Sequence, residues 1–418
     1  MRLENLSEIQ LRRRAVRLFL QGKRPCEILT LIPRSRQWLY KWLRRFEQGS
    51  WQALRSLPRR PQNSKNRYPN SARSLVLNLR RKFQRQSVGL TGARQLRRQI
   101  IRLRLLRSVP SETTIKRWLK EEGLTSRPVT SSTNPYYPQL HPKGFVLQIM
   151  DWAMRYLEGG EKAYVFHTID AESCALSQTI TDNKRTQSLI AHTLTAFQEI
   201  GLPDFLQIDN DSAFNGGNKT PRRIGQFVRF CLYFGIELIF IPPAEPKRNH
   251  LVDNINYLWA RSFFERDHFA SLKLLVERSP RFTQWYSEEY FPPRLEGLTV
   301  AEAKRKFKRR RLTRKEVKKV PESLPITAGR LHFIRRVRAE GEISLLGESF
   351  KVSKRFANKY IWATITTDKK RLDIYYKSSE PSPARLIKSY NYEIGEKVVA
   401  LAKEYRRSAR RKDVRKLM

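Results

Sequence analysis

Three aspartates in the middle of the chain have the side-chain type and the sequence setting that metal-dependent chemistry needs. Asp151 and Asp209 each follow an apolar run, FVLQIM and FLQI, with the composition of a buried strand. Asp253 lies in EPKRNHLVDNINYLW, four residues after Asn249 and three before Asn256, so these three side chains lie close to one face of a helix. Because side chains leave the core at strand ends, we expect the three carboxylates to converge at one edge of a sheet.

Carboxylate oxygens with no His or Cys nearby in the sequence favour Mg²⁺ or Mn²⁺ over zinc. Two such ions can activate a water or a 3′-hydroxyl and stabilise the leaving oxygen of a phosphoryl displacement. Taken singly, each aspartate is more often a turn or cap residue than a ligand, but their positions on successive elements favour a shared site. We therefore predict catalytic and metal-binding roles for Asp151, Asp209 and Asp253, two divalent ions as cofactor, and supporting roles for Asn249 and Asn256.

The elements that must position these carboxylates occupy the central third of the chain. FVLQIMDWA, KAYVFHTIDAES and CALSQTIT are three consecutive strand-like runs. A helical stretch over 186–200, the strand FLQIDN, a helix over 222–233, the strand IELIFIPP and a helix over about 249–264 follow. Three leading strands followed by alternating helices and strands predict an α/β layer.

The first 60 residues have the pattern of a helix-turn-helix unit. In IPRSRQWLYKWLRRF, Ser35 can cap a helix that buries its Trp and Leu residues on one face. Long donor side chains on the other face can reach base edges and phosphates in a major groove. The alternative is an ordinary helical hairpin with a solvated face. We predict DNA contacts from Arg34, Arg36, Gln37, Tyr40, Lys41 and Arg44.

A second unit, 71–123, repeats this pattern and ends in PSETTIKRWLKEEG. Two basic units in tandem favour DNA as the partner, and the Pro-, Asn- and Arg-rich stretch SLPRRPQNSKNRYPN between them is typical of an extended tether. The further side chains predicted to contact DNA are Lys116, Arg117, Lys120, Lys247 and Arg248.

The chain carries a formal charge of +44, concentrated in 1–130 and 271–418, whereas 131–270 is near neutral. This pattern predicts a polyanionic partner, although basic surfaces of a ribosome-binding or chaperone-like protein remain an alternative. No apolar run of eighteen residues and no apolar signal-peptide core occur, which predicts a cytoplasmic protein without a membrane partner. Three cysteines without a Cys-x-x-Cys pair indicate neither a disulfide framework nor a zinc site.

The segments DWA, HTIDAESCA, GLPDFLQIDND, PKRNHLVDNIN and RLEGLTVAEA together resemble the integrase core of DDE transposases, in particular the IS481-like branch of bacterial insertion sequences. The resemblance extends to the N-terminal units and to the C-terminal segments GRLHFIRRV and YIWATI. It implies a ribonuclease-H-like fold with Asp151 and Asp209 at the first two acidic positions. Asp170 matches an acidic position that the family does not use as a core ligand.

The resemblance also implies a function and its partners. The expected activity is binding of element ends followed by metal-dependent DNA strand cleavage and strand transfer, that is, transposition and DNA integration. The expected partners are double-stranded DNA, as terminal inverted repeats and as target, and a further copy of the chain in a homodimer or higher assembly. The expected setting is the bacterial cytoplasm, in association with the nucleoid.

Two positions depart from the family pattern of Asn-Gly-x-Val-Glu. His250 replaces the Gly, and Asp253 replaces the third acid, Glu. The Asp side chain is one methylene shorter, which withdraws its carboxylate by about 1.5 Å. Two hypotheses stay open: an active or weakened transposase, and a catalytically inactive copy that acts only as a DNA-binding protein or repressor. A standalone ribonuclease-H-like nuclease explains the acids but not the two upstream units.

The C-terminal third alternates apolar and polar residues from GRLHFIRRV to LDIYYK, with glycines between short segments, and this predicts a small β-barrel. The predicted architecture is multidomain: an all-α tandem helix-turn-helix, a central α/β integrase core and the barrel. In order, we predict a helix-turn-helix domain (1–60), a second helix-turn-helix or winged-helix-like domain (61–127), a linker (128–144), the catalytic core (145–310), a linker (311–328), the β-barrel (329–378) and a basic tail (379–418).

Overall fold

The computed structural model describes residues 7–56, 68–86, 89, 92–124, 136–138, 140, 144–216, 222–380, 382–406 and 415. The chain divides into two compact units, 1–69 and 70–418. Most of the tether predicted between the two N-terminal units, most of the 128–144 linker and much of the predicted tail lie outside the described residues. None of the helices in the described part has the length and apolar composition that spanning a bilayer requires.

The first unit is built from three helices, α1 (Glu8–Leu20), α2 (Pro25–Leu31) and α3 (Arg36–Gly49). Their apolar faces meet in a core in which Val16, Ile28 and Leu39 are fully buried. The Ser35 hydroxyl accepts a hydrogen bond from the backbone N–H of Trp38 and so begins α3 at the predicted cap. The predicted helical N-terminal unit is confirmed.

The second compact unit, 70–418, includes the helix-turn-helix segment predicted over 71–123. It begins with three further helices, α4 (Asn70–Arg85), α5 (Ala93–Arg102) and α6 (Glu112–Glu121). Ser111 caps α6 by accepting from the N–H of Thr114. Hydrogen bonds tie these helices to the rest of the unit: Gln95 donates to the carbonyl of Glu289 at 2.7 Å, and Arg266 donates to the carbonyl of Phe83 at 3.1 Å.

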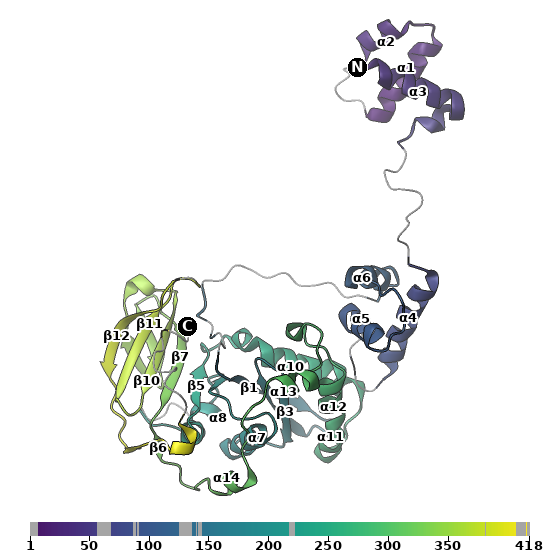
Figure 1. Cartoon of the computed structure of the whole chain (residues 1–418). Coiled ribbons are helices and arrows are strands. Elements are labelled where there is room, and N and C mark those ends of the chain that lie inside the picture. Colours follow the sequence, from purple (N-terminus) through teal and green to yellow (C-terminus); the bar gives the residue numbers. More distant parts are fainter. Residues whose placement is uncertain are drawn as a thin grey trace. The chain divides into compact units, whose positions relative to one another are not determined.

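A nine-stranded sheet forms the centre of the second unit, in the order β12-β11-β10-β7-β5-β4-β1-β2-β3 (Figure 1). β1, β2 and β3 pair antiparallel, whereas β1 with β4, β4 with β5, and β5 with β7 pair parallel. The strands are β1 (Leu147–Tyr156), β2 (Lys162–Asp170), β3 (Leu176–Thr181), β4 (Phe205–Ile208), β5 (Glu237–Phe240), β7 (Arg330–Arg336), β10 (Tyr360–Thr366), β11 (Arg371–Tyr376) and β12 (Arg385–Asn391).

Helices bury both faces of the β1–β5 part of this sheet. Met150 and Phe166 pack in one cluster with residues of α7 and α9, while their neighbours Ile149 and Val165 pack in another with α10 and α12. This two-sided burial explains the near-continuous apolar runs, and the predicted α/β core is confirmed. The helices are α7 (Thr186–Glu199), α8 (Ser212–Asn215), α9 (Gln226–Tyr233), α10 (His250–Ser262), α11 (Leu272–Arg278), α12 (Pro280–Glu288), α13 (Val300–Lys306) and α14 (Arg314–Lys318).

The C-terminal strands continue the central sheet, and the small β-barrel that we predicted over 329–378 stays a prediction. β7 pairs with β5 through Leu238 and Leu331, and β10, β11 and β12 follow in turn. Two short pairs complete this region, β8 (Glu342–Leu345) with β9 (Glu348–Lys351) and β6 (Ile326–Thr327) with β13 (Val398–Val399). β12 and β13 lie within the range predicted as a tail. Alternating polarity identifies a strand but not its neighbour. Without β7, β5 would leave its backbone groups on one side unpaired, and pairing with β7 satisfies them.

Candidate active site

Parallel pairing of β1 with β4 brings Asp151 and Asp209 onto one cavity, although Asp151 lies inside β1 and not, as we expected, at its end, whereas Asp209 directly follows β4. Leu147 on β1 is the register partner of Phe205 on β4, and each aspartate lies four residues beyond that pair. Both face a cavity of about 360 Å³ whose other walls come from the loops after β4 and β5. The cavity is lined by Asp151, Asp209, Asn210, Asp211, Ile241, Pro242, Pro243, Ala244, Glu245 and Asn249.

Asp253 lies in the first turn of α10 and is not part of that lining. Its charge nevertheless acts on Asp151, since it contributes to the raised pKa of that carboxyl. Among the described residues, no group of three or more His, Cys, Asp or Glu side chains lies close enough together to hold a metal ion. The structure thus brings two of the predicted ligands onto one cavity and leaves the third beside it.

The carboxylates are held in an environment that disfavours their negative charge. Burial, followed by repulsion from Asp209 and Asp253, raises the pKa of Asp151 to about 7, although the Trp152 N–H opposes the shift. Burial also raises the pKa of Asp209, against a hydrogen bond from the Asp211 N–H at 2.9 Å. A divalent cation would offset this repulsion, and an all-oxygen donor set suits Mg²⁺ or Mn²⁺. The donor chemistry of Asp151 and Asp209 therefore fits such an ion.

The two predicted supporting residues fix α10 against the sheet. The Asn249 side chain donates to the carbonyl of Met150 at 3.3 Å and accepts from Gln207 at 3.0 Å, which joins the helix start to β1 and β4. Asn256 Oδ1 lies 2.6 Å from Nδ1 of the buried His167 on β2. Because Asp253 lies between these contacts, they determine where its carboxylate stands.

His250 is the first residue of α10 and is exposed. Its φ of −49° is an ordinary right-handed helical value, so the backbone does not require the Gly of the family pattern. Partial burial of its ring, followed by the charge of Arg294, lowers the pKa of His250, while Asp253 opposes this shift. His250 is not part of the cavity lining.

Arg335 on β7 supports the cavity and was missed by sequence reasoning. Its guanidinium donates to Asn210 Oδ1 at 2.8 Å and to the carbonyl of Ile241 at 3.0 Å, while Asn210 Nδ2 also donates to that carbonyl. Burial lowers the pKa of Arg335 to about 10. The C-terminal part of the sheet thus holds both loops of the cavity. An Arg in an alternating strand gives no sequence signal for this role.

Lys184, also missed, provides a positive charge beside the carboxylates. Its Nζ lies 2.8 Å from Asp211 and 4.1 Å from the ring centroid of Trp152, the residue after Asp151. Its charge opposes the upward shift in the pKa of Asp209. No local motif identifies this lysine, since it lies on the connection between β3 and α7.

Arg248, which we predicted to contact DNA, is engaged within the protein. Its guanidinium donates to Glu245 and to the hydroxyl of Tyr360, each at 3.0 Å, and lies 4.2 Å from the ring centroid of Tyr137. These contacts stabilise the wall of the cavity that contains Glu245. The side chain of Lys247 lies outside the described residues.

The other predicted DNA contacts lie on exposed surfaces of their helices. Arg34 precedes α3 and forms an ion pair with Glu8 at 2.7 Å, and Arg117 on α6 lies 3.8 Å from Glu121. All of these predicted residues are exposed: Arg34, Arg36, Gln37, Tyr40, Lys41, Arg44, Lys116, Arg117 and Lys120.

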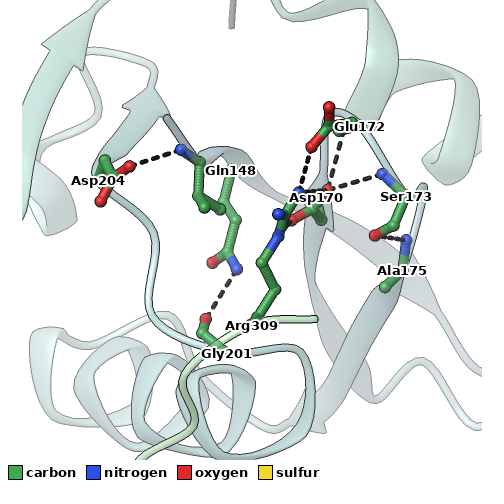
Figure 2. Close-up of polar contacts among 9 residues, drawn as sticks. Gln148, Asp170, Glu172, Ser173, Ala175, Gly201, Asp204 and Arg309 are labelled. Carbon is green, nitrogen blue, oxygen red and sulfur yellow. Dashed lines mark hydrogen bonds and ion pairs between the residues drawn. The ribbon is translucent and has the colours of Figure 1, made fainter. Parts of the chain in front are cut away.

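Asp170 has a structural environment, which agrees with its exclusion from the ligand set. It is fully buried and accepts from the N–H groups of Glu172 and Ser173 and from Arg309, whose Nε lies 3.0 Å away. Figure 2 shows the Arg309 guanidinium between the carboxylates of Asp170 and Glu172. The carboxylate is thus satisfied by the protein itself.

Comparisons with known proteins give one family match and several relatives. Residues 12–73 match the winged helix-turn-helix family. Over 156 residues the chain is 30% identical to the Gag-Pro-Pol polyprotein of Simian retrovirus SRV-2 and 28% identical to that of Mason-Pfizer monkey virus. These matches cover 37% of this chain and 8% of each polyprotein, so the chain spans a small part of the curated relatives.

Solved structures of retroviral proteins are also similar in part. The HTLV-2 integrase catalytic core domain in complex with magnesium is 17% identical and matches 38% of this chain and 94% of that one, with a TM-score of 0.28. The simian T-cell lymphotropic virus intasome in complex with the PP2A regulatory subunit B56 gamma is 14% identical and matches 66% and 88%, with a TM-score of 0.34.

Proposed function

We propose that the chain is a DNA transposase or integrase of the DDE superfamily, which binds element ends and catalyses metal-dependent strand cleavage and strand transfer. The observation that carries this proposal is the pair Asp151 and Asp209, set at matching register on one cavity where the pKa of Asp151 rises to about 7. The winged helix-turn-helix match and the identity to retroviral Gag-Pro-Pol polyproteins add support.

In this proposal Asp151 and Asp209, with Asp253, would hold two Mg²⁺ or Mn²⁺ ions. When bound, such ions activate the attacking oxygen and stabilise the leaving oxygen of a phosphoryl displacement. The chain's own residues position the reaction. Arg335 and Asn210 hold the loops of the cavity, and the exposed faces of α3 and α6 bind the DNA. Water and then a DNA 3′-hydroxyl form the new P–O bond as the old one breaks, so no covalent enzyme intermediate is needed.

The finer assignment is part of the same proposal. The chain belongs, on this proposal, to the IS481-like branch, recognises terminal inverted repeats, and joins them to target DNA. It acts as a homodimer or a higher assembly, because two element ends must be brought together. Its setting is the bacterial cytoplasm, in association with the nucleoid.

A second candidate function is a catalytically inactive copy that binds DNA as a repressor. The position of Asp253 favours it, because this carboxylate is outside the cavity lining. A misplacement on the scale of 1 Å can cost on the order of 100-fold in rate. The longer Glu side chain of the family pattern would extend the carboxylate by about 1.5 Å.

The test is a strand-cleavage and strand-joining assay on DNA ends of the source element, in Mg²⁺ and in Mn²⁺. It compares the native chain with Asp253→Glu and with Asp209→Asn. Products from the native chain that disappear in Asp209→Asn support an active transposase. If only Asp253→Glu gives products, the result supports the inactive copy. If neither the native chain nor Asp253→Glu gives products, the result contradicts the enzymatic proposal.

A further inference from the structure

A second cavity, of about 610 Å³, lies near the C-terminal end of β2, away from the carboxylates of Asp151 and Asp209. Its walls include Ser173 and Ala175 from the β2–β3 connection, Ile200 after α7, and α13 with the segment that follows it. Asp170, at the end of β2, pairs with Gln148 near the start of β1, whereas Asp209 follows the other end of the parallel strand β4. The two cavities lie toward opposite ends of these strands and share none of the lining residues that the structure describes.

The lining of this cavity is strongly basic. Five cationic side chains contribute to it, namely Lys304, Arg305, Lys308, Arg309 and Arg311. Arg309 forms ion pairs with Asp170 and Glu172. For the other four, the described part of the chain provides no ion pair within 4.0 Å. Burial, followed by the charge of Arg311, lowers the pKa of Lys304, and Glu199 opposes this shift. An anion in the cavity would offset the repulsion between these cations.

The basic segment is fixed in place by the protein. The Arg309 side chain reaches back to Asp170, as Figure 2 shows, and the carbonyl of Arg310 accepts from the N–H of Leu202 at 2.7 Å. The N–H of Leu312 donates to the carbonyl of Phe197 at 3.2 Å. The backbone approaches so closely that a Cβ on Gly201 would lie 2.4 Å from Cβ of Arg309. A ligand would thus meet cations whose backbone needs little ordering.

We propose that this cavity binds the phosphate backbone of double-stranded DNA, at a site separate from the carboxylates. The proposal rests on the proposed function, which supplies DNA as the partner. Four cations that line one cavity suit the phosphates of a backbone, and Lys and Arg contacts to phosphate are independent of base sequence. The site would hold duplex on the side of the core away from the reacting strand.

The test measures duplex binding by the full chain in EDTA, which prevents cleavage, over a range of salt concentrations. The cavity variant is Lys308→Gln with Arg311→Gln, both exposed residues of the lining. The matched control is Lys306→Gln with Arg314→Gln, which removes the same charge from exposed residues of the same segment outside the lining. Thermal melting of each chain checks that both variants remain folded.

The plot of log K against log salt has a negative slope, and each lost phosphate contact reduces the magnitude of that slope by about 0.9. We expect the cavity variant to reduce the magnitude of that slope by between about 1 and 2 and to weaken binding several-fold, with less than half that effect in the control. Equal effects of the two variants would overturn the proposal, since the cavity would then add only to the general positive field.

The proposed function and this inference fail in different ways. A native chain that binds duplex but never cleaves it contradicts the enzymatic function alone, because this binding test needs no metal. A native chain that binds no duplex contradicts both. A cavity variant that loses binding of inorganic phosphate but keeps its duplex binding would identify a small-anion site and so overturn the DNA assignment.

Discussion

The central sheet holds aspartates in opposite surroundings toward the two ends of its strands. At one end, Asp170 accepts two backbone N–H groups and an arginine, so its charge is compensated by the protein. At the other, burial, with added repulsion from Asp209 and Asp253, raises the pKa of Asp151 to about 7. A carboxylate that the fold satisfies contributes to stability, whereas carboxylates that the fold crowds together cost stability and need an external cation. This difference, more than residue type, separates a structural acid from a candidate ligand.

The largest expected effect is on catalysis, from Asp209→Asn. Replacing a ligand carboxylate removes charge stabilisation of several kcal/mol, so cleavage should fall on the order of 1000-fold. DNA affinity should stay within about two-fold, because the exposed faces of α3 and α6 are unchanged. Single-turnover cleavage and a filter-binding assay measure the two quantities. Residual cleavage near the native rate would remove Asp209 from the metal site.

The second prediction concerns Asp170, whose charge the protein compensates. Asp170→Asn leaves Arg309 without its buried partner, so the free energy of unfolding should fall by about 3 kcal/mol. Chemical denaturation followed by tryptophan fluorescence measures the change. Arg371→Gln serves as the control, since it breaks the pair with Asp373 from an arginine that is half exposed. If the control loses as much stability as Asp170→Asn, the buried ion pair of Asp170 and Arg309 contributes no more to stability than the more exposed pair, which would contradict the prediction.

The third prediction concerns Asp151, where substitution by Asn should stabilise the protein, whereas substitution of Asp170 should destabilise it. The pKa of Asp151 is raised in the folded chain from 3.8 to about 7, so the folded state binds a proton that the unfolded state releases. Stability of the metal-free protein should therefore fall as pH rises through this window, and the loss should be complete above about pH 8. Asp151→Asn removes the penalty and should stabilise the metal-free chain at pH 8 by about 2 kcal/mol, allowing for solvent screening.

Denaturation of both chains at pH 5 and pH 8 without divalent ions measures this effect. The gain from Asp151→Asn should be clearly smaller at pH 5, where the native carboxyl is largely protonated in the folded state. A substitution that destabilises the chain at both pH values would contradict the account of Asp151 as a crowded, uncompensated acid.

The smallest expected effect is on DNA affinity. Arg36→Ala with Lys41→Ala removes two exposed donors of α3 and should weaken binding of the element end by about 10-fold. Stability and the response to divalent ions should not change, since neither residue belongs to the second unit. Electrophoretic mobility shifts measure the affinity. Unchanged binding would show that α3 does not read the end.

The sequence predicted the elements better than their arrangement. The apolar runs before Asp151 and Asp209 identified β1 and β4, and parallel pairing then placed both acids on one cavity. The same reasoning did not show that the C-terminal strands join the central sheet, because alternation does not reveal that β7 pairs with β5. Arg335 was missed for the same reason, since its role exists only through that pairing. The position of Asp253 depends on side-chain length and helix placement, which no spacing rule provides.

The most direct test of the account is divalent-ion binding followed by thermal melting at pH 8, without DNA. Mn²⁺ should raise the melting temperature of the native chain and of Asp170→Asn by several degrees, because ligand binding stabilises the folded state. It should not raise that of Asp209→Asn. Equal shifts in all three chains would contradict the account, because the ions would then bind somewhere other than the cavity of Asp151 and Asp209.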